Sequence, residues 1–412
     1  MPQSLLIRDR RDFQFSESKF IRMSRIPCLA LLLSFLWQVS YAQRVELTNP
    51  LAVDRPPEIV EIPLRQVLSE LHLAASQAQS IVAKEATTGK RVPSQIYASS
   101  PGGEPDQLLL LVSLRAHEKA AIALRKDANV PTLKKLVFGR EAPERKDDFA
   151  WENDLVTYRI YGPALQATGE ITSGIDVWSK RVPNFVIDSF YKRDQEGTAT
   201  HNPLLSYHKD NGQGLDSYLV GPTRGCGGTA VFADGKLFVS KNYTTMRILA
   251  DGPIRFAFEV SYAPWEANGT TVVETKQIVL DAGTHLNKIT SAYSFHGPET
   301  LNLVAGIAVH SGAATSFPIA NKTAAAWDTP QDPTAGRIAT GLIAAPNQQA
   351  SAVEAAGHAL LEFTRRSGQP FVYYAGSGWS KADMPTSAAW DDYLKLRLSM
   401  LENPLIVEWS AR

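Results

Sequence analysis

The chain has 412 residues, with 42 lysines and arginines against 42 aspartates and glutamates, so its formal net charge is zero. This balance argues against a nucleic-acid-binding protein, which would show a basic excess. Hydrophobic residues make up 44% of the chain. At this length, that content is enough for a substantial core in one large or two medium-sized domains.

The N-terminal region has the pattern of a secretory signal peptide. Arg22 and Arg25 form a basic segment, an apolar run covers residues 26–37, and the small residues Ser40 and Ala42 follow. A signal peptidase reads small residues at these two positions. We therefore expect cleavage after Ala42 and a mature protein in the periplasm or outside the cell.

The same region bears on membrane insertion and on the cysteines. The apolar run is shorter than the ~20 residues of a transmembrane helix, and no second stretch of membrane length follows, so we expect no membrane span after cleavage. Met23 is an alternative start, in which case residues 1–22 are either an over-extended reading of the gene or a disordered leader. Cleavage would remove Cys28 and leave Cys226 as a lone thiol, which excludes an intramolecular disulfide.

The mature chain is predicted to be mostly β. Frequent Gly and Pro punctuate short runs rich in Val, Ile, Phe, Tyr and Thr, and no repeat of fixed period is present. Residues 43–135 are predicted to form a small N-terminal β module, with its clearest strands at 58–64 and 107–114. Residues 65–86 are compatible with either a helix or strands.

Residues 136–412 are predicted to form a large antiparallel β-sandwich with few helices. Residues 234–236 (Asp-Gly-Lys) indicate a hairpin turn, and 387–403 has the apolar spacing of a helix. The strands expected from alternating apolar residues are 155–165, 228–239, 253–265, 271–283, 287–295 and 301–310.

The period of two along a strand decides which side chains share a face. It allows Glu259, Glu274 and His310 to come from adjacent strands to one side of a sheet. The alternative is a solvated face with ion pairs, for which Arg255–Glu259 and Glu274–Lys276 are the candidates.

The densest polar segment is 144–228, which we expect on loops because buried irregular backbone would lack hydrogen-bond partners. Its aromatic, cationic and acidic residues have the composition of a sugar site, in which aromatic rings stack on apolar sugar faces and charged groups bind hydroxyls and carboxylates. The candidate substrate-binding residues are Trp151, Asp154, Trp178, Asp210, Glu259 and Glu274.

Tyr207-His208-Lys209-Asp210 is the sharpest chemical pattern. Elimination beside a uronate carboxylate needs one group to neutralise the carboxylate, one to remove the C5 proton and one to protonate the leaving oxygen. Lysine, histidine and tyrosine suit these roles. The alternative is an exposed polar turn, for which Gly212 supplies backbone freedom.

Arg224 lies in a glycine-rich turn and could pair with a carboxylate in a bidentate manner. The alternative is a strained turn that leads into the next strand. Lys180 and His310 are further candidates for the catalytic set. Cys226 is disfavoured as a nucleophile, because a small buried cysteine is the commoner case.

A cofactor is not required by the sequence. There is no HExxH and no paired CxxC motif, and the histidines are scattered. A divalent cation such as calcium stays open as an alternative, with carboxylates of the polar segment as ligands: Asp147, Asp148, Asp154 and Asp210.

Taken together, DDFAWENDLVTYRIYGPAL, SGIDVWSKR, YHKDNGQGLD and RGCGG resemble a bacterial secreted family of unknown function that is found in polysaccharide-utilisation loci. The resemblance covers nearly the whole mature chain. It implies a carbohydrate-active protein with a galactose-mutarotase-like β-supersandwich. It assigns no catalytic residues, so the residues named above rest on their own chemistry.

The leading hypothesis is an exported enzyme that acts on uronic-acid-containing oligosaccharides by β-elimination, as a lyase or dehydratase. Three alternatives stay open: a glycoside hydrolase with Glu259 and Glu274 as its paired carboxylates, a sugar mutarotase or epimerase, and a non-catalytic glycan-binding protein. The expected partner is an oligosaccharide in each case.

Overall fold

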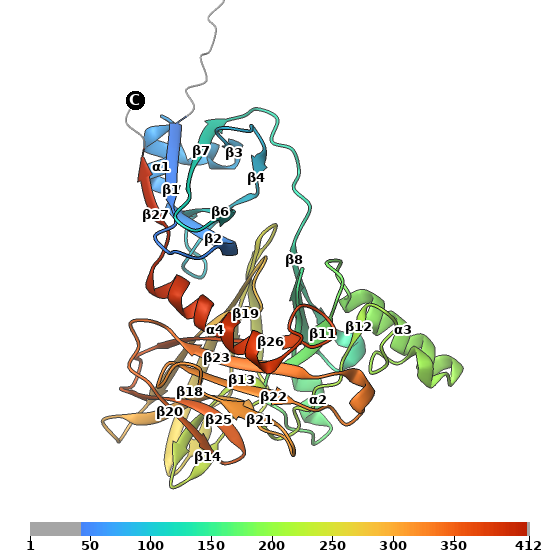
Figure 1. Ribbon diagram of the computed structural model, residues 1–412. Coiled ribbons are helices and arrows are strands. Elements are labelled where there is room, and N and C mark those ends of the chain that lie inside the picture. Colours follow the sequence, from blue (N-terminus) through green and yellow to red (C-terminus); the bar gives the residue numbers. More distant parts are fainter. Residues whose placement is uncertain (1–42, 410–412) are drawn as a thin grey trace, which may run out of the picture. The chain divides into compact units, whose positions relative to one another are not determined.

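The computed structural model describes residues 43–409 and is mostly β, as the sequence predicts. The predicted signal peptide and Cys28 lie outside the described residues. Every pair of strands assigned within 43–409 is antiparallel, apart from one isolated parallel bridge between Ile175 and Gly225. Figure 1 shows the strands and helices in chain order.

The N-terminal strands form two sheets around one apolar cluster, which contains Leu47, Ile62, Leu110 and Leu124. Residues 65–86 divide between the two structures that the sequence left open, with helix α1 (Leu64–Glu70), a 3₁₀ turn η1 (Ala75–Ser80) and then a strand. The strands are β1 (Gln43–Thr48), β2 (Arg55–Pro63), β3 (Ile81–Glu85), β4 (Arg91–Val92), β5 (Ser94–Tyr97), β6 (Gln107–Leu114) and β7 (Lys119–Lys126). The sheet orders are β27-β1-β7-β3-β4, completed by the C-terminal β27 (Ile406–Trp409), and β2-β6-β5.

Two larger sheets make the sandwich. The five-stranded sheet has the order β14-β13-β20-β25-β24, with β13 (Cys226–Ala233), β14 (Lys236–Phe238), β20 (Leu301–Ala308), β24 (Ser351–Ala355) and β25 (His358–Arg365). The nine-stranded sheet has the order β15-β16-β18-β19-β26-β23-β22-β21, and β17 pairs with β18. Its strands are β15 (Thr245–Asp251), β16 (Arg255–Ser261), β17 (Trp265–Ala267), β18 (Thr270–Asp281), β19 (Leu286–Phe295), β21 (Ala314–Ser316), β22 (Thr323–Asp328), β23 (Ile338–Ala344) and β26 (Phe371–Trp379).

The core of the sandwich lies between these sheets, where β13 and β20 contact β23 and β26. Ile289, Leu303, Leu361 and Tyr373 are fully buried there. Because successive side chains of a strand point to opposite faces of its sheet, these side chains point into the sandwich and their neighbours in sequence point away from it. The predicted hairpin at 234–236 is present, because Asp234 and Gly235 both have positive φ between β13 and β14.

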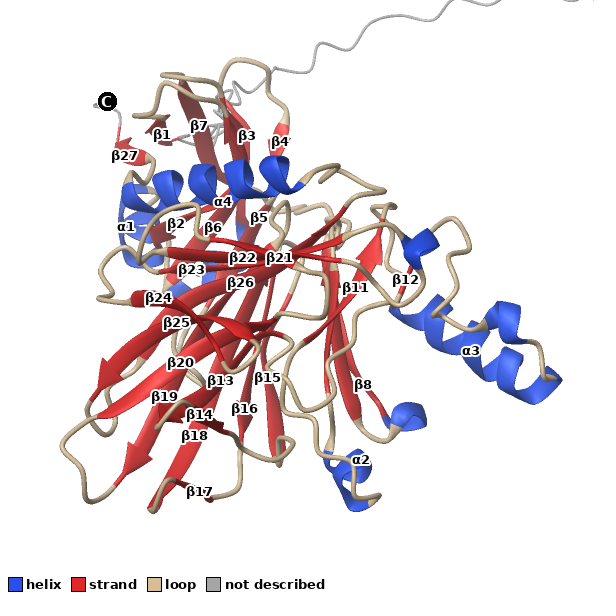
Figure 2. Cartoon of the chain, turned by 60° about the horizontal axis from the view of Figure 1, so that its bottom comes forward, coloured by secondary structure: helices blue, strands red, loops and turns tan. Residues whose placement is uncertain are grey.

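Helix α4 (Ser387–Glu402) matches the predicted helix and covers the outer face of the nine-stranded sheet (Figure 2). The Thr386 side chain accepts a hydrogen bond from the Ala389 amide at 3.1 Å and so caps the helix. Trp390, Leu394 and Leu398 are buried against β22 and β23.

The polar segment 144–228 contains a third sheet and two helices, so the prediction of loops is wrong for these parts and holds for 206–213 and 216–225. The sheet order is β12-β11-β10-β9-β8. The strands are β8 (Val137–Ala142), β9 (Asp148–Asn153), β10 (Thr157–Ile160), β11 (Asp176–Lys180) and β12 (Gly214–Leu215), and the helices are α2 (Pro163–Ala167) and α3 (Ile187–Thr200). All residues of β9, β10 and β11 are buried. Polar residues are tolerated in these buried strands because they form ion pairs and hydrogen bonds with one another.

The predicted shared face of Glu259, Glu274 and His310 is also wrong. Glu259 pairs in register with Gln277, so Glu274, three positions away on β18, points to the opposite face. His310 follows β20, which belongs to the other sheet. This geometry excludes Glu259 and Glu274 as a hydrolase pair.

Of the two predicted ion pairs, Lys276–Glu274 is present, whereas Arg255 binds other carboxylates. Arg255 donates to both oxygens of Asp281 at 2.6 and 2.8 Å and to Glu61 at 2.6 Å. Glu259 instead accepts from Arg247 at 3.0 Å. The predicted Arg255–Glu259 pair is absent because β16 lies between β15 and β18. These neighbouring strands supply Arg247 for Glu259 and Asp281 for Arg255.

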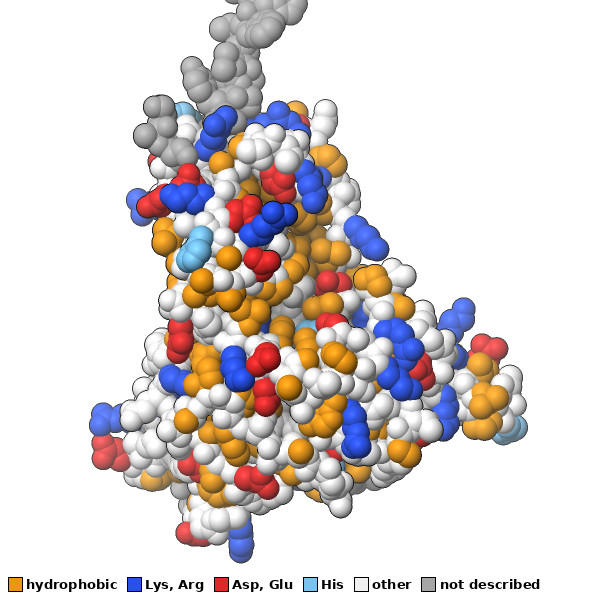
Figure 3. Space-filling model, viewed as in Figure 1, with side chains coloured by type: hydrophobic (Ala, Val, Ile, Leu, Met, Phe, Trp, Pro, Cys, Tyr) orange, Lys and Arg blue, Asp and Glu red, His pale blue; other side chains and the backbone are white. Residues whose placement is uncertain are grey.

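Basic and acidic side chains are interspersed on the face shown in Figure 3, in keeping with the zero net charge. Within residues 43–409, no helix has the length and hydropathy needed to cross a membrane.

Candidate functional site

Residues from four loops surround a cavity of about 770 Å³, here called the His208–His310 cavity. One wall comes from the turn between η3 (Pro203–Leu205) and β12, and continues into the segment after β12. The other wall comes from the ends of β20 and β22 and the loop up to η4 (Pro333–Ala335). The residues that carry its chemistry are His208, Lys209, Asp216, Ser217, Tyr218, His310, Asp328 and Asp332.

His208 is held in one tautomer. Its Nδ1 lies 2.9 Å from the backbone carbonyl oxygen of Asp216. Because a carbonyl oxygen only accepts hydrogen bonds, Nδ1 must carry the proton, and Nε2 of the neutral ring then has a free lone pair. The side chain is 57% exposed. His208 therefore presents a base at the wall of the cavity.

His310 faces two acceptors. Its Nδ1 contacts a carboxylate oxygen of Asp328, and its Nε2 lies 2.7 Å from the carbonyl oxygen of Leu219. Both nitrogens are satisfied only when both are protonated. The hydrogen bond that His310 donates to Asp328 raises the pKa of His310, in opposition to burial. His310 is thus an imidazolium paired with Asp328 rather than a free base.

A second positive charge comes from Lys209, whose Nζ lies 3.7 Å from Asp332 across the cavity. Both side chains are about half exposed, at 54% and 46%. Such a pair contributes little to stability. An incoming anion can therefore compete with Asp332 for Lys209 at small cost.

Several buried polar atoms of the cavity residues have no hydrogen-bond partner within the described part of the chain. These atoms are Asp216 Oδ1, Ser217 Oγ, Tyr218 Oη and Asp328 Oδ1. Unpaired buried polar atoms are rare in native proteins and require an explanation, such as a bound ligand. Four such atoms belong to residues of this one cavity. A ligand rich in hydroxyl groups could supply hydrogen-bond partners for atoms of this kind.

Beneath this wall, three buried carboxyl groups surround one buried guanidinium. Arg159 Nη2 lies 2.5 Å from Asp176 and 3.1 Å from Asp216, and Nη1 lies 4.0 Å from Asp148. All four side chains are less than a tenth exposed. Burial raises the pKa of Asp148 to about 6, although Arg159 opposes the shift.

Tyr207 lies beside this cluster and not in the cavity. It is 1% exposed, and its hydroxyl accepts hydrogen bonds from Arg145 and Arg159. Its ring stacks on Trp178, with 5.4 Å between the centroids. Burial raises the pKa of Tyr207, in opposition to the two arginines. Tyr207 is thus placed to position the adjacent His208 rather than to touch a ligand.

Asp148→Asn is expected to stabilise the protein at neutral pH. With a folded-state pKa of about 6 against the ordinary 3.8, the folded state binds this proton more tightly than the unfolded state. The stability it provides is therefore present below pH 3.8 and is lost as pH rises towards 6. Relative to wild type, the variant should gain about 2–3 kcal/mol between pH 4 and pH 7, measured by urea unfolding.

The matched control is Asp392→Asn, which removes an exposed carboxylate of α4. Its stability relative to wild type should stay level over the same range. A flat difference for Asp148→Asn as well would show that Asp148 is ionised throughout.

Besides Tyr207, two more residues of the predicted catalytic set, Lys180 and Arg224, lie outside the cavity. Lys180 Nζ is fully buried and donates to Glu152 at 2.8 Å and to the Asn153 carbonyl at 2.7 Å, so its charge is already neutralised. Burial lowers the pKa of Lys180, in opposition to Glu152.

Arg224 is also internal. It is 1% exposed and donates from Nη1 to Ser173 Oγ and to the Thr229 carbonyl, each at 3.2 Å. The close approach that the glycines permit is to the chain itself, because a side chain at Gly225 (φ +56°) would strike the Ile175 carbonyl. The turn thus serves the fold instead of a ligand. The Cys226 thiol is buried, and burial raises its pKa, so it is not activated.

The predicted substrate-binding residues do not meet in the cavity. Trp151 and Trp178 have no exposed surface and so offer no ring face to a sugar; Trp151 Nε1 donates to Asn287 at 2.8 Å. Asp154 accepts from the Gly283 amide at 2.8 Å, and Asp210 pairs with Arg181. Glu259 and Glu274 belong to the opposite faces already described.

Within the described residues, no three His, Cys, Asp or Glu side chains are grouped as a metal site would require. The carboxylates considered as cation ligands are dispersed: Asp148 faces Arg159, whereas Asp154 and Asp210 are engaged as above.

Sequence reasoning missed Asp216, Tyr218 and Asp328 as site residues. Asp216 and Tyr218 lie in the segment HNPLLSYHKDNGQGLDSY, whose density of polar residues was the available signal. Asp328 ends strand β22, which is rich in alanine, and the sequence around it gave no signal of a site.

A second cavity, of about 490 Å³, lies between β5 and the β15–β16 turn. Its Lys135 and Asp251 pair with each other at 2.7 Å. It contains no histidine, so it lacks the general base that the first cavity has.

The fold and site define an antiparallel β-sandwich protein with a histidine- and carboxyl-lined cavity. The chain belongs to the family described as "Domain of unknown function (DUF4861)", whose model matches residues 47–407. The match spans the N-terminal sheets and the sandwich together. "Uncharacterized protein P7" of Formosa agariphila is 29% identical over 398 residues, which cover 93% of this chain and 97% of that protein.

Two solved structures from Enterococcus faecalis are similar at a low level. One is described as a protein in glycosyl hydrolase family 38 (TM-score 0.45, 9% identity) and the other as an alpha-mannosidase (TM-score 0.44, 10% identity). Each match covers 90% of this chain but only 48% and 46% of the solved chains, so this chain spans about half their length.

Proposed function

We propose that the protein is an exported enzyme that cleaves or dehydrates uronic-acid-containing oligosaccharides by β-elimination at the His208–His310 cavity. The observation that carries the proposal is the set of groups around this one cavity. It has a histidine with a free Nε2, a half-exposed lysine with a weak partner, a His310–Asp328 ion pair, and buried polar atoms that need partners. Its volume of about 770 Å³ lies within the range of small-molecule sites.

Each group has a role in the elimination. His208 Nε2 removes the proton at C5 of the uronate, as a general base. Lys209 binds the uronate carboxylate in place of Asp332 and stabilises the negative charge that develops on it. The ion pair of His310 with Asp328 forms the opposite wall, so Lys209 is the cation that takes the carboxylate. The Ser217 hydroxyl, which has no partner within the described residues, binds a sugar hydroxyl.

The surroundings of the other predicted cations support Lys209 as the group that binds the uronate carboxylate. Lys180 and Arg224 were the other candidates to bind the uronate carboxylate, but both are buried and engaged within the protein. Lys209 keeps about half of its side chain exposed and has only a weak partner. It is therefore the lysine best placed to exchange its partner for a ligand.

The test is incubation of the mature protein with a panel of uronic-acid oligosaccharides. Elimination forms a C4=C5 double bond that absorbs in the ultraviolet. Mass spectrometry then shows either chain cleavage into an unsaturated product or the loss of one water. The absence of both signals over the panel contradicts the proposal. Binding without turnover, unaffected by His208→Ala, favours a glycan-binding protein, and cleavage with addition of water favours a hydrolase.

A further inference from the structure

The carboxyl cluster below the cavity has more negative than positive groups. Asp148, Asp176 and Asp216 share the single buried guanidinium of Arg159. Three carboxylates in one buried site do not all ionise when one buried cation and the partly exposed Arg145 compensate them. The cluster must therefore keep a proton near neutral pH.

The hydrogen bonds indicate which of the two closest carboxyl groups keeps it. Asp176 is the better-paired group, because Arg159 Nη2 at 2.5 Å, the Val177 amide at 2.8 Å and Trp178 Nε1 at 3.3 Å all donate to it. Asp216 accepts from Arg159 at the longer distance of 3.1 Å and from the backbone amide of Tyr218, and its Oδ1 is among the unpartnered buried atoms. Donors favour the charged form, so Asp176 is the carboxylate and Asp216 the carboxylic acid.

Asp216 also lies where a proton is useful. It lines the His208–His310 cavity, and its Oδ2 lies 3.7 Å from His208 Nδ1. Burial and the charge of Asp176 both raise the pKa of Asp216 well above its ordinary value, and Arg159 opposes them. The other ionisable groups that face it or its carboxyl partners are Arg145, Tyr161, Tyr207 and His208.

We propose that Asp216 is the general acid of the site: it keeps its proton at neutral pH and gives it to the leaving oxygen of the ligand. This assignment rests on the elimination proposed above. No sequence pattern identifies it, because the proton depends on three carboxyl groups that come from three different strands or loops.

The step balances without a cofactor. His208 Nε2 takes the C5 proton, and the electrons of that C–H bond form the C4=C5 double bond. The C4–O bond breaks, its electron pair stays on oxygen, and Asp216 protonates that oxygen. The enzyme is left with a His208 imidazolium and an Asp216 carboxylate. Release of one proton from His208 to water and uptake of one by Asp216 restore the starting state.

The first experiment measures the proton itself and needs no substrate. Infrared spectra of the mature protein, titrated from pH 5 to pH 9, report the carbonyl stretch of a buried carboxylic acid. We expect one such band at pH 7 that is lost in Asp216→Asn and retained in Asp332→Asn. Asp332 is a matched control because it lines the same cavity but is partly exposed, with a pKa lowered by hydrogen bonds from Thr334. The absence of the band, or its loss in Asp176→Asn but not in Asp216→Asn, overturns the assignment.

The second experiment measures delivery of the proton. With a turned-over uronate oligosaccharide, the wild-type kcat should fall on the alkaline side as Asp216 loses its proton. Asp216→Asn should lower kcat by about 10²–10⁴-fold and abolish that alkaline fall. An unchanged kcat or pH profile contradicts the acid role. The infrared band can behave as expected while no uronate oligosaccharide reacts. That result contradicts the elimination and the role of Asp216 as its acid, but it still shows that Asp216 is protonated at neutral pH.

Discussion

His208→Ala is expected to reduce kcat on a uronate oligosaccharide by about 10²–10⁴-fold, because it removes the only cavity group with a free basic nitrogen. The ring is half exposed, so its loss should leave the unfolding midpoint nearly unchanged. Added imidazole should restore part of the rate in the truncated variant. The measurement is the initial rate of formation of unsaturated product.

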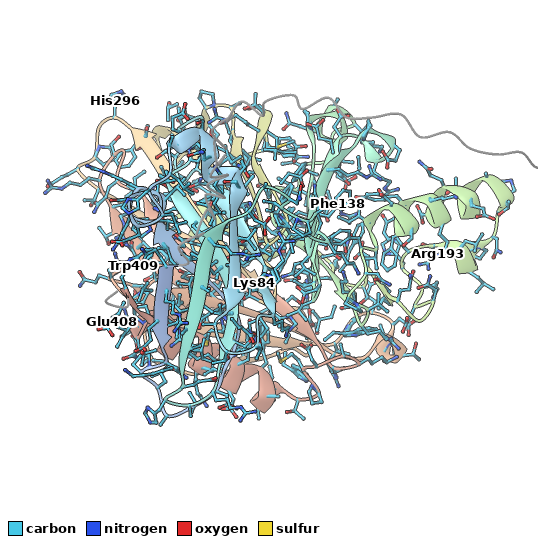
Figure 4. The ribbon with its side chains drawn as sticks, turned by 90° about the horizontal axis from the view of Figure 1, so that it is seen from above. Lys84, Phe138, Arg193, His296, Glu408 and Trp409 are labelled. Carbon is cyan, nitrogen blue, oxygen red and sulfur yellow. The ribbon has the colours of Figure 1, made fainter. Side chains whose placement is uncertain are left out.

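The matched control for this variant is His296→Ala. His296 is exposed in the loop between β19 and β20, and Figure 4 shows it on the opposite side of the view from Arg193 of helix α3. This control should keep the wild-type rate. Equal rates in wild type and His208→Ala would show that His208 is not the general base.

Lys276→Met is expected to destabilise the fold by about 3–5 kcal/mol, the usual cost of leaving one partner of a buried ion pair uncompensated. Glu274 is 0% exposed and Lys276 2%. Lys276 donates to Glu274 and lies 4.3 Å from the centre of the Tyr262 ring. Burial lowers the pKa of Lys276, and Glu274 opposes the shift. The measurement is the free energy of unfolding in urea.

The double variant Glu274→Gln/Lys276→Met separates charge from packing. Glutamine keeps an acceptor for the Thr229 hydroxyl, which bonds Glu274, and removes the buried charge. We expect the double variant to recover most of the lost stability. A loss equal to that of the single variant would mean that packing, rather than charge, is the cause.

Strands β18 and β19 of the sandwich could be predicted because buried side chains alternate with more exposed ones along them. The predicted segment 287–295 is β19 to within one residue, and 271–283 is β18 to within two residues at each end. Helix α4 was predicted from its apolar spacing. Helix α3 was missed because its buried residues, such as Ile187 and Phe190, gather in its first turns, and the remainder is polar.

The buried polar strands could not be predicted because polarity alone suggests exposure. Strand β9 contains Asp148, Glu152 and Asn153, all buried. Their partners, such as Lys180 for Glu152, come from strands that only the fold brings near. The same limit applies to the site: His208 and Lys209 stood out as neighbours in sequence, whereas the contact of His310 with Asp328 depends on two distant strand ends.

The pairing of β27 with β1 gives the chain a particular order of folding. Thr48 pairs with Ile406 and Val45 with Trp409, so this sheet joins residues separated by almost the whole described sequence. Closing so long a loop is slow compared with forming local hairpins. The sheet order β27-β1-β7-β3-β4 can be completed only after the last strand has been synthesised. A shortened chain that lacks 406–409 would leave β1 with an unpaired edge open to pairing with other chains.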